Sequence, residues 1–215
     1  MKIQPNNKLL MIGDSITDCG RTRPIADSHS SGLGNGYVSL IDGLLNATDP
    51  QLGIGVINTG VGGDTVRELK SRWQTDVLNL QPDWLSIFIG INDVWRHFDG
   101  LATIKDQVTI EEYEATLVEL IQQTRPYLQG LVLMTPYFIE PNRQEPMRKM
   151  MDQYGNVVHH LAKEFQAILV DTQAALDTVL AHLPPAALSS DRVRPNLTGH
   201  LLLARAFLKA VDYSW

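Results

Sequence analysis

Four polar clusters in this sequence contain residue types that could together catalyse acyl transfer. The first cluster, residues 13–18, places Ser15 directly after a short apolar run. A serine at the point where a buried strand gives way to a helix keeps its backbone N–H free beside its hydroxyl. The hydroxyl could attack a carbonyl carbon while the N–H stabilises the oxyanion that develops. Taken alone, Ser15 could equally be the N-cap of a helix.

The second and third clusters offer further donors for such an oxyanion. Glycines in residues 58–64 let the backbone approach a ligand closely, and Gly63 is the best candidate donor. Asn92, in residues 90–93, offers a side-chain amide at the end of another apolar run. We therefore expect a three-donor oxyanion hole from Ser15, Gly63 and Asn92. A phosphate-binding loop at 58–64 is disfavoured because the lysine and spacing of a P-loop are missing, and Asn92 could instead be a turn residue.

The fourth cluster, residues 191–196, contains Asp191 and Arg194. An attacking serine needs a group that accepts its proton near neutral pH and returns it to the leaving alcohol. A guanidinium group stays protonated and has no acceptor lone pair, so Arg194 cannot be that base. Its spacing from Asp191 favours a charge-assisted pair that would hold the loop in shape.

Short apolar runs alternate with helical patterns along the chain. The runs predict strands at residues 9–12, 54–57, 84–89, 131–134 and 168–170, and the helical patterns occupy residues 37–45, 65–80, 110–128, 147–165 and 199–211. Near-continuous apolar runs are typical of parallel strands buried on both faces. The alternation predicts an α/β fold, a three-layer α/β/α sandwich around a parallel sheet of about five strands. Ligand chemistry should gather at the carboxyl ends of these strands.

The last predicted helix, residues 199–211, should pack one apolar face on the sheet, with Thr198 as its N-cap. That face would be formed by Leu201, Ala204, Leu208 and Val211.

Composition and charge narrow the class of protein. The 215 residues are 44% apolar and 20% charged, which fits one globular domain over residues 1–215. The formal net charge of -6 gives no electrostatic reason to bind nucleic acid or anionic membranes. Cys19 is the only cysteine, which excludes an internal disulfide. Because no stretch has the pattern of a signal peptide or the length of a membrane span, a cytoplasmic location is expected.

The motifs GDSITD, NTGVGGDTV, GIND and DRVRPNLTGH resemble the successive blocks of the SGNH (GDSL) hydrolase family and extend along the whole chain. The stretches IGDSITDCGR, GINDVWR, LMTPYFIE and MDQYG are similar to intracellular acetylxylan esterases of carbohydrate-degrading bacteria. The resemblance implies a flavodoxin-like fold, a serine esterase without metal or cofactor, and a homo-oligomer. It also implies Ser15 as nucleophile, Ser15, Gly63 and Asn92 as the oxyanion hole, and Asp191 as the acid that orients the base.

One position departs from the family pattern. The last block should read Asp-x-x-His-Pro, but Arg194 replaces the histidine. We therefore expect an inactive or strongly impaired enzyme. His200 is a weak substitute because it lies six residues further on, inside the last predicted helix. The other histidines match no motif and are expected to be solvent-facing or structurally satisfied; they are His29, His97, His159, His160 and His182.

The expected substrate is a small acylated molecule, such as an acetylated xylo-oligosaccharide. Trp95 and Tyr137 could stack on sugar faces. Asp14 is a candidate substrate-binding residue, although Asp14 and Asp18 could instead stabilise the helix that starts at Ser15.

Three alternatives remain. The first is a short-chain carboxylesterase or lysophospholipase-like GDSL enzyme, and the second is a carbohydrate-binding protein that keeps the pocket without the chemistry. The third, a metal-dependent hydrolase, is disfavoured because the aspartates near the motifs lack the spacing of a known ligand set.

Overall fold

A computed structural model describes residues 1–25, 31–101, 103 and 105–214. Within this part of the chain, parallel strands form one sheet in the order β2-β1-β3-β4-β5. The strands are β1 (Lys8–Gly13), β2 (Gly55–Asn58), β3 (Trp84–Phe88), β4 (Gly130–Met134) and β5 (Ile168–Val170). The sheet and its helices confirm the predicted α/β sandwich, and every predicted strand lies within two residues of the observed bounds.

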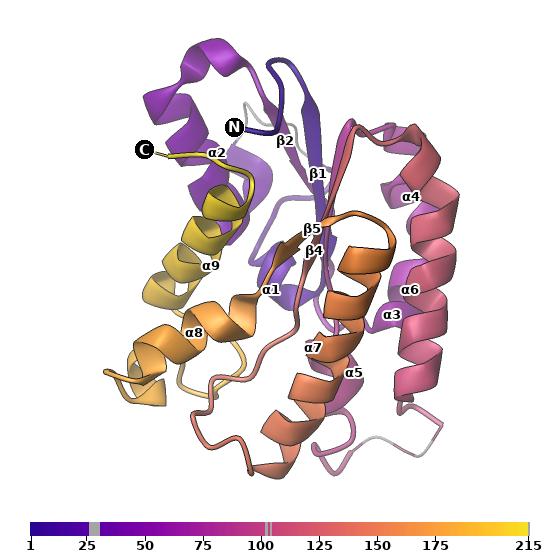
Figure 1. The fold of residues 1–215 in the computed structure, drawn as a ribbon, viewed down its shortest axis with the longest axis vertical. Coiled ribbons are helices and arrows are strands. Elements are labelled where there is room, and N and C mark those ends of the chain that lie inside the picture. The colour runs from indigo at the N-terminus through magenta and orange to yellow at the C-terminus, as the bar shows by residue number, and fades with distance from the viewer. Residues whose placement is uncertain (26–30, 102, 104, 215) are drawn as a thin grey trace.

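Helices cover both faces of this sheet (Figure 1). One face carries α2, α8 and α9, the other carries α3, α4, α6 and α7, and the short α1 and α5 lie toward the carboxyl edge. Their bounds are α1 (Ser15–Asp18), α2 (Tyr37–Thr48), α3 (Val66–Ser71), α4 (Trp73–Asp76), α5 (Ile91–Trp95), α6 (Ile110–Thr124), α7 (Pro146–Glu164), α8 (Thr172–Leu180) and α9 (Leu197–Ala210). None of the described helices is long and apolar enough to cross a membrane.

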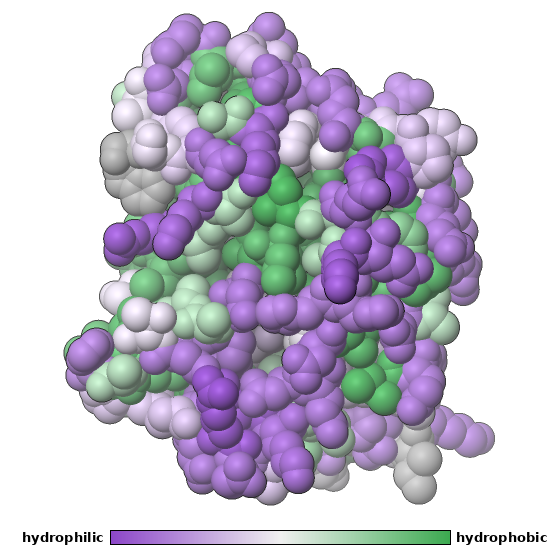
Figure 2. All heavy atoms as spheres, in the orientation of Figure 1, coloured by the Kyte–Doolittle hydropathy of each residue, from purple (hydrophilic) through white to green (hydrophobic). Residues whose placement is uncertain are grey.

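Burial of the strands explains their apolar sequence. Leu9, Leu10, Met11 and Ile12 of β1 have no exposed surface, because helices cover both faces of this central strand. β5 is an edge strand. Figure 2 shows apolar residues gathered near the centre of the molecular surface that faces the viewer, in the region of β5. Because the interior strands are tightly packed on both sides, they hold the loops at their carboxyl ends in fixed positions.

The single helix predicted at residues 65–80 was wrong. The segment divides into α3 and α4 at Arg72, whose backbone leaves the helical conformation at φ -107° and ψ 6°. Arg72 instead turns its side chain toward the ends of β1 and β2, where it donates hydrogen bonds to backbone carbonyl groups. Helical periodicity alone could not reveal this interruption, because the apolar residues on both sides of Arg72 keep their spacing.

The last helix begins earlier than predicted. Asn196, and not Thr198, is the N-cap of α9, because the Asn196 side chain accepts a hydrogen bond from the Gly199 N–H at 3.2 Å. Leu201 is exposed, and the buried face is formed by Leu203, Ala204, Phe207 and Leu208. α8 was not predicted at all.

Candidate active site

Ser15 is the first residue of α1, directly after β1. Asp14 caps this helix, since Oδ1 of its carboxyl group accepts a hydrogen bond from the Ile16 N–H at 2.9 Å. The first N–H groups of a helix have no acceptor within the helix, so the Ser15 N–H is free beside its own hydroxyl. The predicted role of Asp14 in stabilising the helix start is confirmed.

The loop after β2 lies against α1. A Cβ atom built on Gly62 would lie 3.8 Å from Ser15 Cβ, and the Gly62 N–H donates to Asp18 Oδ2 at 3.1 Å. Gly63 has φ +88°, a left-handed conformation that side chains rarely adopt. Glycine adopts this backbone conformation without the strain that a side chain would add. Asp18 also stabilises this loop, and because it lies in the first turn of α1 it can still support the helix start as predicted.

Asn92 lies in the first turn of α5, at the end of β3. Its Nδ2 donates to the carbonyl of Asp64 at 2.8 Å, and the residue is 7% exposed. An amide nitrogen carries two hydrogens, so one remains for a ligand. Because Asp64 directly follows Gly63, this contact links Asn92 to the loop beside Ser15.

Arg72 connects these parts of the site, a role that could not be predicted from the sequence. Its Nη2 donates to Gly13 O at 2.9 Å, its Nη1 to Thr59 O at 2.5 Å, and its Nε to Asp64 Oδ2 at 2.6 Å. One side chain thus joins the end of β1 to the loop after β2. No motif indicates this role, because an arginine inside an apparently continuous helix is normally read as a surface residue.

Asp191 and Arg194 form the predicted ion pair. Arg194 Nη1 lies 2.8 Å from Asp191 Oδ2, and the Arg194 N–H donates to Asp191 Oδ1 at 2.8 Å. The guanidinium also lies over the Trp95 ring, 5.4 Å from its centroid. Since Trp95 and Asn92 share α5, the Asp191 loop is held beside the element that carries Asn92.

The carboxyl group of Asp191 stays ionised near neutral pH. Partial burial raises the pKa of Asp191. Hydrogen bonds from the Arg194 and Val193 N–H groups and from Ser189 Oγ, together with the Arg194 charge, lower it. The net result is a pKa below the ordinary value. An ionised carboxylate is what is needed to orient and stabilise an imidazolium.

His200 is buried among other groups. It is 5% exposed, its Nδ1 accepts a hydrogen bond from the Tyr37 N–H at 3.2 Å, and its Nε2 lies 3.4 Å from Cys19 Sγ. Burial lowers the pKa of His200 to about 4 and raises the pKa of the Cys19 thiol. Both ring nitrogens are therefore occupied inside the protein.

The remaining described histidines mostly have partners. His97 Nε2 lies 2.9 Å from Val108 O, His159 lies 3.1 Å from Asp171, and His160 lies 3.7 Å from Glu164. His29 lies outside the described residues.

The predicted substrate-binding roles of Asp14 and Tyr137 disagree with the burial of both side chains. Asp14 is 2% exposed and caps α1, so its carboxyl group cannot reach a substrate. Tyr137 is fully buried, and its hydroxyl donates to Val193 O at 3.1 Å, so its ring cannot stack on a sugar. Tyr137 instead supports the loop that carries Asp191 and Arg194. Trp95, which is partly buried, is the one predicted aromatic residue that retains accessible surface.

Asp14 and Asp93 are fully buried carboxyl groups close to Ser15 and Asn92 in the chain. Burial, together with the neighbouring charges of Asp93 and Asp64, raises the pKa of Asp14 to about 8. Burial likewise raises the pKa of Asp93 to about 7. Among the described residues, no group of three His, Cys, Asp or Glu side chains could hold a metal ion.

Asp14→Asn is expected to weaken the dependence of stability on pH. The folded protein keeps the Asp14 proton up to a pKa of about 8, whereas the unfolded chain loses it near the ordinary value of 3.8. The unfolded state therefore binds fewer protons in this window, and the free energy of unfolding falls as the pH rises. Urea unfolding at about pH 5 and about pH 8 should show a smaller fall for Asp14→Asn than for the parent. The exposed Asp212→Asn is the control, and an equal fall in all three proteins would contradict the assignment.

The chain matches a known protein family and is similar to characterised esterases. Residues 11–202 match the model of the GDSL-like Lipase/Acylhydrolase family. The chain is 54% identical to an acetylxylan esterase of Geobacillus stearothermophilus over 215 residues, which are all of this chain and 98% of that protein. The crystal structure of Axe2, an acetylxylan esterase from Geobacillus stearothermophilus, has a TM-score of 0.98 to this chain, with 53% identity and coverage of 100% of this chain and 98% of that one.

A second solved structure is also similar. LAE5, an alpha/beta hydrolase enzyme from the metagenome of Lake Arreo in Spain, has a TM-score of 0.96 and 46% identity, covering 99% of this chain and 98% of its own. Three other crystal structures are described as catalytic mutants of Axe2, in which a serine, an aspartate or a histidine is replaced by alanine.

Proposed function

Because the chain belongs to the family of GDSL-like lipases and acylhydrolases, we propose that its site is built for carboxylic ester hydrolysis through an acyl-enzyme. Ser15 is the nucleophile, and the N–H groups of Ser15 and Gly63 with the Asn92 amide stabilise the oxyanion. The observation that carries this proposal is the series of contacts from Ser15 through the Gly62 loop and Asp64 to Asn92. The same series continues from α5 to Asp191 through Trp95 and Arg194.

We also propose that Arg194 occupies the place of the catalytic base, so that this form turns over ester slowly. The positions mutated in the Axe2 catalytic mutants are numbered 15, 191 and 194. At the same numbers this chain has Ser15, Asp191 and Arg194. His200 is not a substitute, because Tyr37 and Cys19 occupy its two ring nitrogens.

The proposed substrate is an acetylated carbohydrate, such as an acetylated xylo-oligosaccharide. The name of the Geobacillus relative supports this choice, and Trp95 offers a partly exposed ring beside Asp191 and Arg194 for a sugar face. We further propose that the chain acts as a single domain and assembles as a homo-oligomer.

The substrate proposal is tested with the Arg194→His variant on p-nitrophenyl esters of increasing acyl length. We expect acetyl esters to be hydrolysed with a kcat/KM at least about tenfold above octanoyl esters, because an enzyme specific for acetyl groups discriminates against added methylene groups. Release of acetate from acetylated xylo-oligosaccharide should accompany this preference, and Ser15→Ala in the same background is the control. A preference for octanoyl esters would favour a lysophospholipase-like enzyme instead.

A non-catalytic carbohydrate-binding protein is a second candidate, and Arg194 is the observation that favours it. The ion pair with Asp191 keeps the loop ordered without a base. Binding of acetylated sugar without turnover, in the Arg194→His variant as well as in the parent, would support this function.

A further inference from the structure

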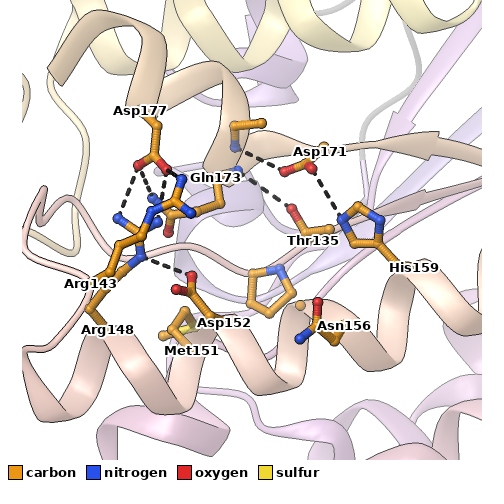
Figure 3. A pocket seen from close by; sticks show the side chains of 13 residues that line it. Thr135, Arg143, Arg148, Met151, Asp152, Asn156, His159, Asp171, Gln173 and Asp177 are labelled. Atoms are coloured by element: carbon orange, nitrogen blue, oxygen red, sulfur yellow. Dashed lines mark hydrogen bonds and ion pairs between the residues drawn. The ribbon is translucent and has the colours of Figure 1, made fainter. Parts of the chain in front are cut away.

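A cavity that Ser15 does not line lies between α7 and the first turns of α8. Its volume is about 350 Å³, at the small end of the range for ligand pockets, which is roughly 300 to 1,000 Å³. Figure 3 shows side chains of α7 and α8 pointing into it from two sides, with the end of β4 at its base. We call it the α7–α8 pocket; the residues that matter below are Arg143, Arg148, Met151, Asp152, Asn156 and Asp177.

The charges of this pocket largely neutralise one another. Arg148 is 1% exposed, and its guanidinium donates to Asp152 at 2.8 Å and to both carboxylate oxygens of Asp177 at 3.0 and 2.8 Å. His159 pairs with Asp171 at 3.1 Å (Figure 3). The buried arginine is thus already paired with carboxylates, and neither a free anion nor a free cation would find an unpaired charge of opposite sign at the base.

Polar groups at the rim remain accessible to a ligand. The Arg143 side chain is 71% exposed and contacts Asp177 at 3.2 Å through one nitrogen only. Asn156 is exposed on α7, and its amide offers both donors and an acceptor. Asp152 uses Oδ1 toward Arg148, and a carboxylate has a second oxygen that accepts hydrogen bonds.

The buried part of the pocket lining combines apolar and polar side chains, because Pro136 and Met151 lie there together with the paired Arg148. A third apolar lining residue, Ala174, is exposed. In Figure 3 the Met151 side chain lies among the lining groups below the arginines. Apolar side chains next to hydrogen-bonding groups suit a neutral ring that carries hydroxyl groups at its edge and C–H groups on its faces.

We propose that the α7–α8 pocket binds one sugar ring of a neutral oligosaccharide, at a site separate from Ser15. The pocket lies close to the start of α5, the helix that carries Asn92. A Cβ atom built on Gly90, the N-cap of α5, would lie 2.9 Å from Cβ of the lining residue Pro136. A ring held there would add a second point of attachment for an oligosaccharide. The choice of xylotriose as the first probe rests on the proposed function, whereas the sugar class rests on the pocket itself.

The test is titration of the isotope-labelled full chain with xylotriose, followed by amide NMR. We expect weak, millimolar-range binding that shifts amides in residues 152–159 of α7 and in the first turn of α8. Asn156→Trp places a large ring in the pocket from an exposed helix position and should abolish these shifts. The matched control is Gln153→Trp, because Gln153 is exposed on the same helix but does not line the pocket. Arg143→Ala should raise Kd by about fivefold, as loss of a charged hydrogen-bond donor does.

Two results would overturn the sugar site. One is unchanged xylotriose binding by the Asn156→Trp variant. The other is that inorganic phosphate shifts the same amide signals while neither xylotriose nor maltotriose shifts them. A response to maltotriose alone would support the sugar site and contradict the proposed xylo-oligosaccharide substrate. Ester hydrolysis by Arg194→His is measured separately, so failure of the proposed function leaves this titration interpretable.

Discussion

Replacement of Arg194 by histidine is expected to raise the rate of ester hydrolysis by several orders of magnitude. Removal of the base from a serine hydrolase can cost on the order of a millionfold in kcat, while the oxyanion hole and binding alone retain about a thousandfold over water. Restoration of an imidazole should recover most of that difference. Steady-state hydrolysis of p-nitrophenyl acetate by the parent and the Arg194→His variant measures it.

The proposed partner of such an imidazole is Asp191. Asp191 is ionised near neutral pH and already accepts hydrogen bonds from the backbone of its own loop. A histidine at position 194 would accept the Ser15 proton as the hydroxyl attacks the ester carbonyl, and would return it to the leaving alcohol. Water would then be activated in the same way to release acetate from Ser15.

Arg194→Gln separates the gain of a base from the loss of a cation. Glutamine removes the guanidinium and its ion pair with Asp191, but it cannot take up a proton near neutral pH. We expect Arg194→Gln to stay near the parent rate. Equal activation by glutamine and histidine would show that the positive charge, and not the missing base, limits the parent.

Asn92→Ala in the Arg194→His background is expected to lower kcat by about a hundredfold to a thousandfold. This is the usual cost of removing one oxyanion donor, because the lost hydrogen bond is strongest in the transition state. KM should change much less, since the ground-state carbonyl carries little charge. Steady-state kinetics with p-nitrophenyl acetate measures both constants.

The control for this prediction is Asn46→Ala, which removes an exposed amide on α2. Asn92 also donates to Asp64 O, so urea unfolding should accompany the kinetics to exclude a general loss of fold. A folded Asn92→Ala variant whose kcat stays within about tenfold of its background would remove Asn92 from the oxyanion hole.

Local patterns predicted the sheet and the positions of the polar clusters. Runs such as residues 9–12 are apolar throughout because both faces of the strand are covered, and this pattern is readable without coordinates. The carboxyl ends of parallel strands share one edge, so Ser15 and Asn92 could be expected near each other. The pair formed by Asp191 and Arg194 was also predictable, because only three positions separate the two side chains.

Long-range contacts were beyond the reach of those patterns. Arg72 interrupts a helix because carbonyl groups of two distant segments accept its hydrogen bonds. Tyr137 has a residue type suited to sugar stacking, but its hydroxyl finds an acceptor at Val193 O inside the protein. The cap of α9 depends on whether Asn196 or Thr198 reaches the free N–H groups, and both residue types are good caps.

In the proposed site, Ser15 faces an oxyanion hole and lacks only its proton acceptor. The most direct measurement is the rate at which a fluorophosphonate labels the protein, with the labelled peptide identified by mass spectrometry. We predict that Arg194→His is labelled at Ser15 several orders of magnitude faster than the parent. Equal labelling rates, or a label on a residue other than Ser15, would contradict the account.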